Sequence, residues 1–266
     1  MNITTLTNAK SFINIEGTDY DTLLTSYIVS TSMQFERYLE RHLKVMERTE
    51  RYILFPNQKT VHVNGFPIEL DSDALPKLIV YDANNSVISD DNYDVYTSER
   101  DQGKVIFYNS YNFITKMSMT YTGGMAYDTE DTTITGTTGS SNEYTFTDLN
   151  ATFITDQVVY GDTLTIDSTE YRIVGPTSET ELVILDIMEE DTDLSYTITK
   201  PGIITKYPDL QLACLLQVLM LYKQKDKVDV ASSSVGGQSV SYTKFRPIDL
   251  LPESKSILDS YKLQTY

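Results

Sequence analysis

The sequence has little of what cross-linked, metal-binding or nucleic-acid-binding proteins use. Its 266 residues include one cysteine, two histidines and no tryptophan. A single cysteine excludes a disulfide framework within the chain and a zinc site built on several thiolates. Basic residues are also scarce, because 21 Lys and Arg face 38 Asp and Glu, which gives a formal net charge of −17. This balance argues against a broad basic surface that grips nucleic-acid phosphates.

Long hydrophobic runs are missing as well. The most apolar stretch is residues 210–222, and a membrane-spanning helix needs about 20 apolar residues, so this stretch predicts a buried core helix. The first ten residues lack the basic region and the following apolar region of a secretory signal. We therefore expect no membrane association and synthesis in a reducing cytoplasm.

The chain does have enough apolar material to build a core, with 40% hydrophobic residues and 20 tyrosines. Residues 21–43 place apolar side chains at spacings of three, four and seven, which predicts one long amphipathic helix capped by Asp19 or Asp21. A short helix over residues 9–13, capped by Thr7 or Asn8, is expected before it. Two later helices are predicted to begin near Pro208 and Pro252.

Between residues 45 and 122 the apolar period changes to two, which predicts short antiparallel strands arranged as a small sandwich or barrel. Residues 128–143 are rich in Thr, Gly, Ser and acid, a composition typical of a linker. A second set of strands follows up to Pro201-Gly202. The predicted strands are 51–55, 60–63, 77–81, 93–96, 104–108, 116–121, 143–146, 163–166, 171–174, 181–185 and 195–199.

These patterns predict an α+β fold: a helical bundle with a small antiparallel β-sheet, plus an inserted small all-β domain that resembles a barrel. The expected boundaries are residues 1–127 for the core, 128–201 for the inserted β domain, and 202–266 for the continued core with a buried helix, an arm and a C-terminal helix. A β module of roughly 70 residues is large enough to fold alone.

Two acidic clusters could in principle hold calcium, because hard cations take several carboxylates at once. Neither has the spacing of a calcium-binding loop, so solvated acidic turns are the expected interpretation. The clusters are Asp186, Glu189, Glu190, Asp191 and Asp193, and Asp82, Asn84, Asn85, Asp90 and Asp91.

Catalytic patterns are also absent from the sequence. Cys214 lies in the apolar stretch and is expected to be buried, and neither His42 nor His62 has a neighbouring partner in the sequence. No glycine-rich phosphate loop and no nucleophile elbow occurs. We expect no enzyme activity, no cofactor and no metal.

Residues 232–242 form a Ser- and Gly-rich arm around Gly236 and Gly237. The stretch from Val235 to Phe245 alternates enough to add as a strand to the sheet edge of a neighbouring subunit. A flexible loop is the alternative, and the sequence leaves both open.

The order of these elements resembles that of the head–tail connector proteins (adaptor or head-completion proteins) of tailed bacteriophages. A helical hairpin leads to a strand that ends in Met119-Thr-Tyr-Thr-Gly-Gly124, and Tyr207-Pro-Asp-Leu210 precedes the apolar helix. A Gly-Gly arm and a helix beginning at Leu250-Leu-Pro-Glu253 complete the order. In the family a Pro-x-x-Leu segment follows the Gly-Gly turn within a few residues, whereas here about 80 residues intervene. The resemblance therefore covers about 1–126 and 203–266, with an insertion between them.

This resemblance implies a virion protein of the phage neck: a homo-oligomeric ring, usually of twelve subunits, between the portal protein and the tail-side neck or stopper proteins. DNA would pass through the ring without specific binding, and twelve copies of a −17 chain would repel its phosphates. The arm and last helix would supply the contact to the portal or to neighbouring subunits. The residues expected in this contact are Val235, Gly236, Gly237, Val240, Tyr242, Phe245, Ile257, Leu258 and Tyr261.

Two other functions remain open from the sequence. One is a β-rich binding or receptor-adhesion module, for instance a carbohydrate binder, although the lack of tryptophan weighs against stacking on sugars. The other is a hydrolase whose carboxylate pair is hidden among the acidic residues, because such a pair is identified by its separation in space.

Overall fold

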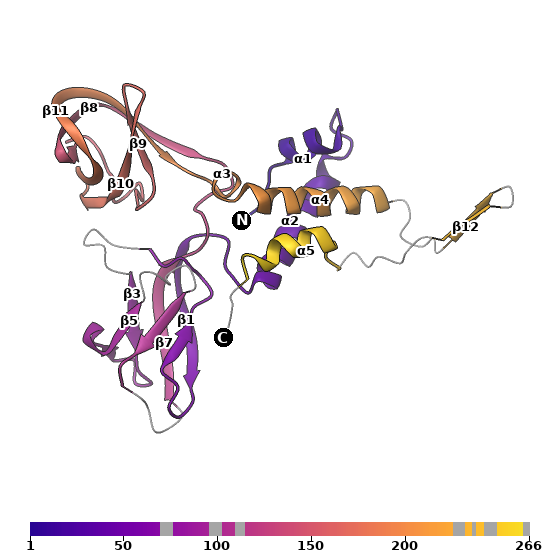
Figure 1. The fold of residues 1–266 in the computed structure, drawn as a ribbon, viewed down its shortest axis with the longest axis horizontal. Coiled ribbons are helices and arrows are strands. Elements are labelled where there is room, and N and C mark those ends of the chain that lie inside the picture. Colours follow the sequence, from indigo (N-terminus) through magenta and orange to yellow (C-terminus); the bar gives the residue numbers. More distant parts are fainter. Residues whose placement is uncertain are drawn as a thin grey trace. The chain divides into compact units, whose positions relative to one another are not determined.

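A computed structural model of the chain describes residues 1–69, 77–95, 103–109, 115–225, 232–235, 238–241 and 249–262. The described residues form a mixed α+β structure with five α-helices and antiparallel sheets (Figure 1). Contacts between residues divide the chain into two compact units. Residues 1–40 and 207–266 make up a largely helical unit, and residues 41–206 make up a largely β unit.

The two predicted N-terminal helices are present, but their N-terminal cap residues differ from those predicted. Helix α1 spans Leu6–Ile13 and is capped by Thr5, whose hydroxyl accepts a hydrogen bond from the Asn8 amide at 3.2 Å. The predicted caps at Thr7 and Asn8 were therefore wrong, because both residues lie inside the helix. Helix α2 spans Asp21–Leu39. The predicted apolar stripe of α2 is confirmed at four buried positions, Leu24, Ile28, Phe35 and Leu39.

Helices α4 (Pro208–Gln224) and α5 (Pro252–Asp259) each begin at the predicted proline. The buried Gln217 side chain joins the end of the chain to α4: its Nε2 donates to the Asp249 carbonyl at 3.1 Å and its Oε1 accepts from the Leu251 amide at 3.0 Å. Ser254 of α5 donates to the Ala213 carbonyl at 3.0 Å. Helix α5 is therefore built into the helical unit by buried hydrogen bonds. None of the helices among the described residues has the length and apolarity to cross a membrane.

Part of the predicted arm forms two short strands, β12 (Ser232–Val235) and β13 (Gln238–Ser241). They pair with each other as an antiparallel hairpin, with Ser232 opposite Ser241 and Val235 opposite Gln238. The arm therefore does form strands, and in this structure of the chain alone the two strands pair with each other.

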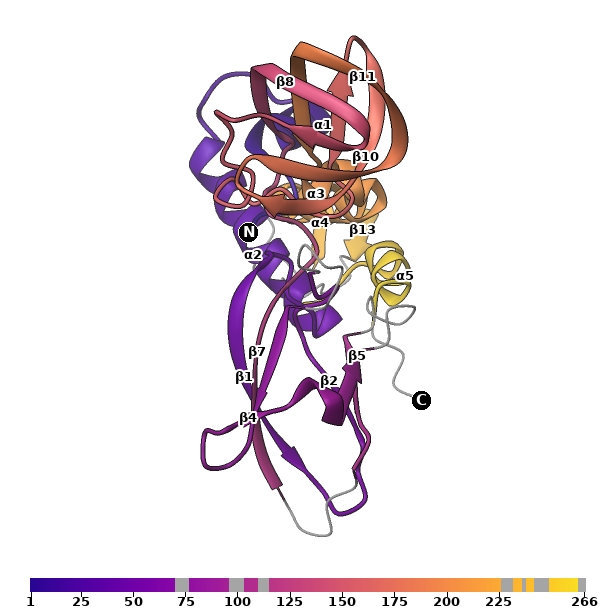
Figure 2. The ribbon, with the colours of Figure 1, turned by 90° about the vertical axis from the view of Figure 1, so that its left-hand side faces the viewer.

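The β unit begins with two open sheets. A first sheet has the strand order β1-β7-β3-β4 and a second sheet the order β2-β6-β5. The long central pair β1–β7 runs in register from Met46 opposite Gly123 to Leu54 opposite Thr115 (Figure 2). The strands are β1 (Met46–Leu54), β2 (Thr60–His62), β3 (Leu78–Tyr81), β4 (Val87–Ile88), β5 (Tyr93–Val95), β6 (Lys104–Phe107) and β7 (Thr115–Gly123), with a 3-10 turn η1 (Asp90–Asn92) before β5.

Alternation along these strands builds one core between the two sheets, as the period of two predicted. On β7, Met117, Met119 and Tyr121 face inward and are buried, while the residues between them are partly exposed. Val105 and Phe107 of the second sheet join the same cluster. Burial of apolar area at about 25 cal/mol per Å² provides the main force that holds the two sheets together.

The Gly-Gly turn after β7 is a crossing point of three backbone segments. A Cβ atom at Gly123 would lie 2.1 Å from the Gly65 carbonyl oxygen, and one at Gly124 would lie 2.4 Å from the Lys44 carbonyl oxygen. Gly124 also has a φ of +147°. Only glycine fits both positions, so the motif that suggested the family resemblance has a structural reason.

Strands β8 (Thr132–Thr147), β9 (Thr163–Ile166), β10 (Thr169–Ser178) and β11 (Glu181–Lys200) form what we call the β8–β11 module. Two predictions about it were wrong. The Thr-rich segment expected as a linker forms the first part of β8, because β-branched threonine suits a strand. The acidic segment expected as a turn lies within the long strand β11.

The β8–β11 module is not a barrel, which corrects the barrel-like expectation. Strand β8 pairs with one edge of β11. Both β9 and β10 pair with the other edge, β9 along residues 196–199 and β10 along residues 181–184. Register shifts in the middle of the β8–β11 ladder allow β11 to bend. Only four strands take part, and the sheet remains open.

The module has its own hydrophobic cluster, formed by residues from within 134–198, with Phe146, Phe153 and Tyr196 in mutual ring contact at its centre. Its entry and exit are adjacent, because Thr132 pairs with Lys200 at the base of the ladder. The boundaries predicted for the inserted domain remain a prediction, which this geometry makes easy to test.

We predict that replacing residues 132–200 by a short Gly/Ser turn leaves the rest of the chain folded, because the two cut ends already lie opposite each other. The midpoint of cooperative thermal unfolding of the remainder should shift by less than about 4 °C, equivalent to about 1 kcal/mol. Circular dichroism and calorimetry against the full chain measure it. Loss of the cooperative transition would show that the module belongs to the core of the two other sheets.

Candidate functional site

A partly buried carboxylate in the first sheet, that of Glu50, accepts hydrogen bonds from several elements. Glu50 of β1 accepts from the Tyr121 hydroxyl at 2.8 Å and from the Tyr52 hydroxyl. The Asn64 amide donates to it at 3.3 Å, and His42 Nε2 lies 3.3 Å from it. Burial opposes ionisation of Glu50, but these donors outweigh it and lower its pKa to about 2.

This arrangement holds a loop rather than offering a reactive group. The Tyr121 hydroxyl also accepts from the Gly65 amide at 2.7 Å, so Glu50 and Tyr121 together fix the loop after β2. A general acid would need a raised pKa, whereas Glu50 remains ionised, so it does not support the carboxylate-hydrolase alternative.

We predict that Glu50→Gln lowers the free energy of unfolding by about 1–3 kcal/mol at pH 7. The folded pKa is depressed, so the stabilisation is present above the unfolded pKa of about 4.5 and is lost as the pH falls toward 2. The difference between wild type and variant should therefore shrink between pH 5 and pH 3 in urea titrations. Glu47→Gln, at an exposed position of the same strand, is the control and should change stability by less than about 0.5 kcal/mol. An equal loss in both variants would contradict the role of Glu50.

A second carboxyl, Asp162, lies before β9 and is only 4% exposed. Its Oδ2 accepts a hydrogen bond from the Val159 amide at 3.0 Å. Burial has the largest effect and raises the pKa of Asp162 to about 7, and the nearby charge of Glu69 also raises it. The hydrogen bond from Val159 and the positive charges of Lys200 and Lys206 act in the opposite direction but are outweighed. Of the carboxyls that the structure describes, Asp162 alone has a clearly raised pKa.

Lys200 lies at the base of the β8–β11 module and is 8% exposed. Its ammonium donates to the Asp156 carbonyl at 2.6 Å and to the Gln157 carbonyl at 2.5 Å, and it lies 4.7 Å from the centre of the Tyr127 ring. The Tyr127 hydroxyl donates to Glu69. Burial lowers the pKa of Lys200, and the nearby carboxylates oppose this. These contacts join the end of β11 to the loop between β8 and β9 and to Tyr127, which lies just before β8.

We predict that Asp162→Asn makes stability less dependent on pH. The folded pKa of Asp162 lies above the ordinary aspartate pKa of 3.8, so its ionisation destabilises the folded state progressively as the pH rises from about 4 to 7. Relative to wild type, the variant should gain about 2–4 kcal/mol between these limits, which urea unfolding at several pH values measures. Asp94→Asn, an exposed position on β5, serves as the control. A pH-independent difference between Asp162→Asn and wild type would contradict the raised pKa.

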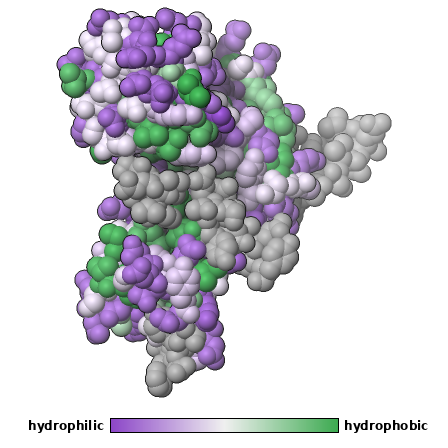
Figure 3. Space-filling view, turned by 60° about the vertical axis from the view of Figure 1, so that its left-hand side comes forward, coloured by the Kyte–Doolittle hydropathy of each residue, from purple (hydrophilic) through white to green (hydrophobic). Residues whose placement is uncertain are grey.

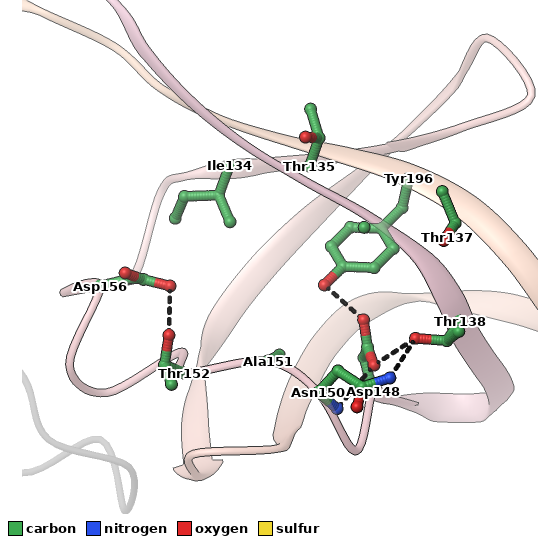
Figure 4. Close-up of a pocket in the computed structure, with 11 residues that line it drawn as sticks. Ile134, Thr135, Thr137, Thr138, Asp148, Asn150, Ala151, Thr152, Asp156 and Tyr196 are labelled. Carbon is green, nitrogen blue, oxygen red and sulfur yellow. Dashed lines mark hydrogen bonds between the residues drawn. The ribbon is translucent and has the colours of Figure 1, made fainter.

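A polar pocket of about 320 Å³ opens in the β8–β11 module, between β8 and the loop that follows it (Figure 4). Strand β11 contributes Tyr196 and β8 contributes residues 134–138, whereas residues 148–156 form the other wall. Gly136 allows Tyr196 to lie against β8, because a Cβ atom there would come within 2.3 Å of the tyrosine ring.

Asp148 organises one end of this pocket and is 3% exposed. Its Oδ1 accepts from the Thr138 hydroxyl at 2.7 Å and from the Asn150 amide at 2.9 Å, while its Oδ2 accepts from the Tyr196 hydroxyl at 2.9 Å. Burial would raise the pKa of Asp148, but these hydrogen bonds outweigh it and lower the pKa. At the other end, Thr152 donates to Asp156 at 2.8 Å.

The sequence did not point to this pocket. Its walls come from the segment expected as a linker, from a loop without a motif and from a strand about 50 residues further on. The Asp148-x-Asn150 pattern, a common turn signal, is the one local feature that could have drawn attention to the loop.

The acidic clusters of the sequence do not come together as metal sites. Among the described residues, no group of three or more His, Cys, Asp or Glu side chains is arranged to hold a metal ion. Asp186 of β11 pairs instead with Arg172 at 2.7 Å. Asp82 accepts hydrogen bonds from the amides of Asn84 and Ser86 at 2.8 Å each, which makes its cluster a turn as expected.

Cys214 is confirmed as a core residue of α4. Its side chain is fully buried, and burial raises the pKa of the thiol to about 12 although a hydrogen bond with Ser32 lowers it. A thiol in this state is a poor nucleophile. Of the two histidines, His42 lies beside Glu50 and His62 is in β2.

The residues expected to contact the portal or a neighbouring subunit lie in four different surroundings. Val235 and Val240 lie on β12 and β13, while Gly236, Gly237, Tyr242 and Phe245 lie outside the described residues. Leu258 is fully buried in the helical unit. Ile257 is partly exposed, and Tyr261 donates to Asp209 at 2.5 Å and packs edge-on against Tyr207 with ring centres 5.6 Å apart.

The face of the first sheet that points away from its core carries exposed apolar side chains. Ile53 of β1 is 55% exposed, Ile79 of β3 is 44% exposed and Val87 of β4 is 65% exposed, among Thr and Ser residues of β7. Cross-strand pairing places these residues on one side, because the alternate positions Leu54, Leu78 and Val80 are buried. In the space-filling view, hydrophobic and hydrophilic surface alternate in small patches (Figure 3). We call the side of the first sheet that carries Ile53, Ile79 and Val87 the outer face.

Comparison with known protein families identifies the first part of the chain. Residues 3–102 match the model of the phage gp6-like head-tail connector protein family. No curated protein matches the chain. The family resemblance drawn from the order of elements is thereby confirmed over this range. The family is one of structural proteins of the phage neck, which agrees with the expectation that the protein is not an enzyme and that its partners include neck components such as the portal.

Proposed function

We propose that this chain, whose residues 3–102 match the model of the head–tail connector family, forms a ring in the phage neck that joins the portal to the tail-side components and surrounds the DNA channel. The family match carries the proposal. Twelve subunits remain the expected number, on the ground of the resemblance alone.

Charge supports a channel through which DNA slides. Each phosphate that a protein neutralises releases counterions and adds affinity. A chain with a formal net charge of −17 repels the DNA phosphates instead of neutralising them. A ring of such subunits would hold DNA weakly, which suits transit during packaging and ejection.

A closed ring needs a head-to-tail interface, in which one patch of a subunit meets a different patch of the next. The outer face offers one such patch through Ile53, Ile79 and Val87. In the helical unit, Val29 and Met33 of α2 are 40% and 50% exposed and lie one turn apart, which offers a second. We assign the subunit contact to these two patches.

The arm is proposed to contact the portal through the β12–β13 hairpin. An isolated two-stranded hairpin is marginally stable in water, and its strands pair only with each other among the described residues. A partner that pairs with either outer edge would stabilise it. Because Leu258 is buried, helix α5 can add only its exposed side, near Ile257, to this contact.

We predict that Ile79→Glu and Met33→Glu each reduce incorporation into particles at least about tenfold, because a buried unpaired charge costs more than 1.4 kcal/mol at an interface. Occupancy is measured by quantitative mass spectrometry of purified virions. Leu149→Glu is the matched control: this side chain of the β8–β11 module is 83% exposed, and its replacement should leave occupancy unchanged.

The arm requires a separate variant. Truncation after Asp229 would also remove α5 and the hydrogen bonds of Gln217, so the fold would suffer. Replacing residues 232–241 by a Gly/Ser segment of equal length tests the arm alone and should abolish binding to portal-bearing heads. A cryo-EM map that shows the chain as a two-fold dimer away from the neck would refute the whole proposal, whereas undiminished binding of the arm variant would refute only the portal contact.

A further inference from the structure

The pocket of the β8–β11 module has a shape and a chemistry that the connector role does not use. At about 320 Å³ it is at the lower end of the range of small-molecule sites, about 300–1,000 Å³. This is room for one ring-sized ligand. Most small-molecule pockets are largely apolar, whereas this one is lined mainly by hydroxyls, carboxylates and an amide.

The polar groups are placed at two ends, with apolar groups between them (Figure 4). At one end the Tyr196 hydroxyl meets Asp148, and at the other the Thr152 hydroxyl meets Asp156. Ile134 and Ala151 lie between these hydroxyl–carboxylate pairs on opposite sides of the space. A ligand that fits must present hydrogen-bonding groups around its rim and apolar C–H surface in its middle.

The end at Asp148 is pre-organised. Three hydrogen bonds hold its carboxylate, and the Asn150 side-chain amide donates to the Thr138 hydroxyl at 3.0 Å, which leaves the second amide N–H for a ligand. At the other end, Asp156 accepts from Thr152 at one oxygen, and a carboxylate has acceptor sites for about four hydrogen bonds. The pocket therefore offers a fixed donor at one end and a strong acceptor at the other.

Three ligand classes fit less well. An apolar ligand would remove water from the carboxylates without replacing their hydrogen bonds. An anion would be repelled by Asp148 and Asp156, and the lining contains no Lys or Arg. A metal ion would find two carboxylates, of which Asp148 already accepts three hydrogen bonds.

We propose that this pocket binds a neutral saccharide ring. The hydroxyls of a pyranose both donate and accept, so they can pair with Asp156 and Asn150 at opposite ends. The C–H face of the ring would pack against Ile134 and Ala151. This inference is independent of the ring proposal, and the failure of either leaves the other standing.

The test uses the full chain and a panel of glucose, galactose, mannose and N-acetylglucosamine. Each sugar is titrated to about 50 mM, because a single ring held by a few hydrogen bonds is expected to bind with a millimolar Kd. Amide NMR shifts report the site. Saturable shifts at Asn150, Ala151 and Thr152 with at least one sugar are expected, and glucose 6-phosphate should bind more weakly than glucose.

Two variants examine the pocket itself. Asp156→Ala removes the acceptor while leaving the backbone carbonyl that Lys200 uses, and Ala151→Phe fills the space. Each should weaken binding at least about tenfold, with thermal unfolding confirming that the variants fold. Asp191→Ala is the matched control, since this exposed carboxylate on β11 bonds only to the next amide among its described contacts and should leave the Kd unchanged.

The outcomes are decisive in both directions. No saturable shift with any of the four sugars, or equal binding by Asp156→Ala and wild type, would overturn the proposal. Calcium chloride alone producing the same shifts at lower concentration would replace it with a cation site. Where a sugar binds, disaccharides that carry it at the non-reducing end separate the two sources: retained binding indicates the end of a glycan chain, and lost binding indicates a free monosaccharide.

Discussion

The close backbone crossing at Gly123 and Gly124 is the constraint on which the β unit depends. Strand β7 pairs with β1 on one edge and with β3 on the other, so its end lies directly against the chain around Lys44 and Gly65. Any side chain there would separate these segments and lose the hydrogen bonds that Met125 and Ala126 make to the Leu43 carbonyl, both at 3.0 Å. The register of the first sheet, the position of the loop after β2 and the direction in which the chain leaves toward β8 are all set at this point.

The acidic side chains of this chain differ in pKa according to whether they are buried or exposed. Glu50 is partly buried and Asp148 is buried, and both are surrounded by donors that lower their pKa values. Asp162 accepts from the Val159 amide and is influenced by Lys200 and Lys206, but the effect of burial is the largest and its pKa rises. Most other carboxylates are on the surface, where each contributes to the repulsion of phosphate at low desolvation cost. Donors from the backbone, tyrosines and amides thus keep Glu50 and Asp148 ionised, whereas Asp162 shows what happens to a buried carboxyl with too few of them.

Much of the fold could be predicted because the periodic patterns are local. The stripe of Leu24, Ile28 and Phe35 identified α2, and the alternation around Met117 and Met119 identified β7. The errors arose where amino-acid composition was used to predict backbone conformation. Residues 132–142 resemble a linker because they are rich in Thr and Gly. Threonine favours strands, however, and the glycines lie where the rings of Tyr196 and Phe146 pack against the strand. Barrel closure and the pocket depend on which edge of β11 each strand joins, and no local pattern encodes that choice.

The attachment of the β8–β11 module is compatible with both proposals, the connector role and the pocket as a ligand site. Its first and last residues, Thr132 and Lys200, pair with each other, and just beyond them Gly202 packs on the backbone of Glu130 at a distance that excludes a side chain. The module therefore begins and ends at one point, and no strand of the first sheet has to change its register to accommodate it. Because the pocket lies within the module and uses only residues of the module, its lining can vary without altering the outer face or the Gly123–Gly124 crossing. Selection on the two surfaces can then proceed separately, which is the physical condition for adding the proposed ligand recognition to a subunit of the proposed ring.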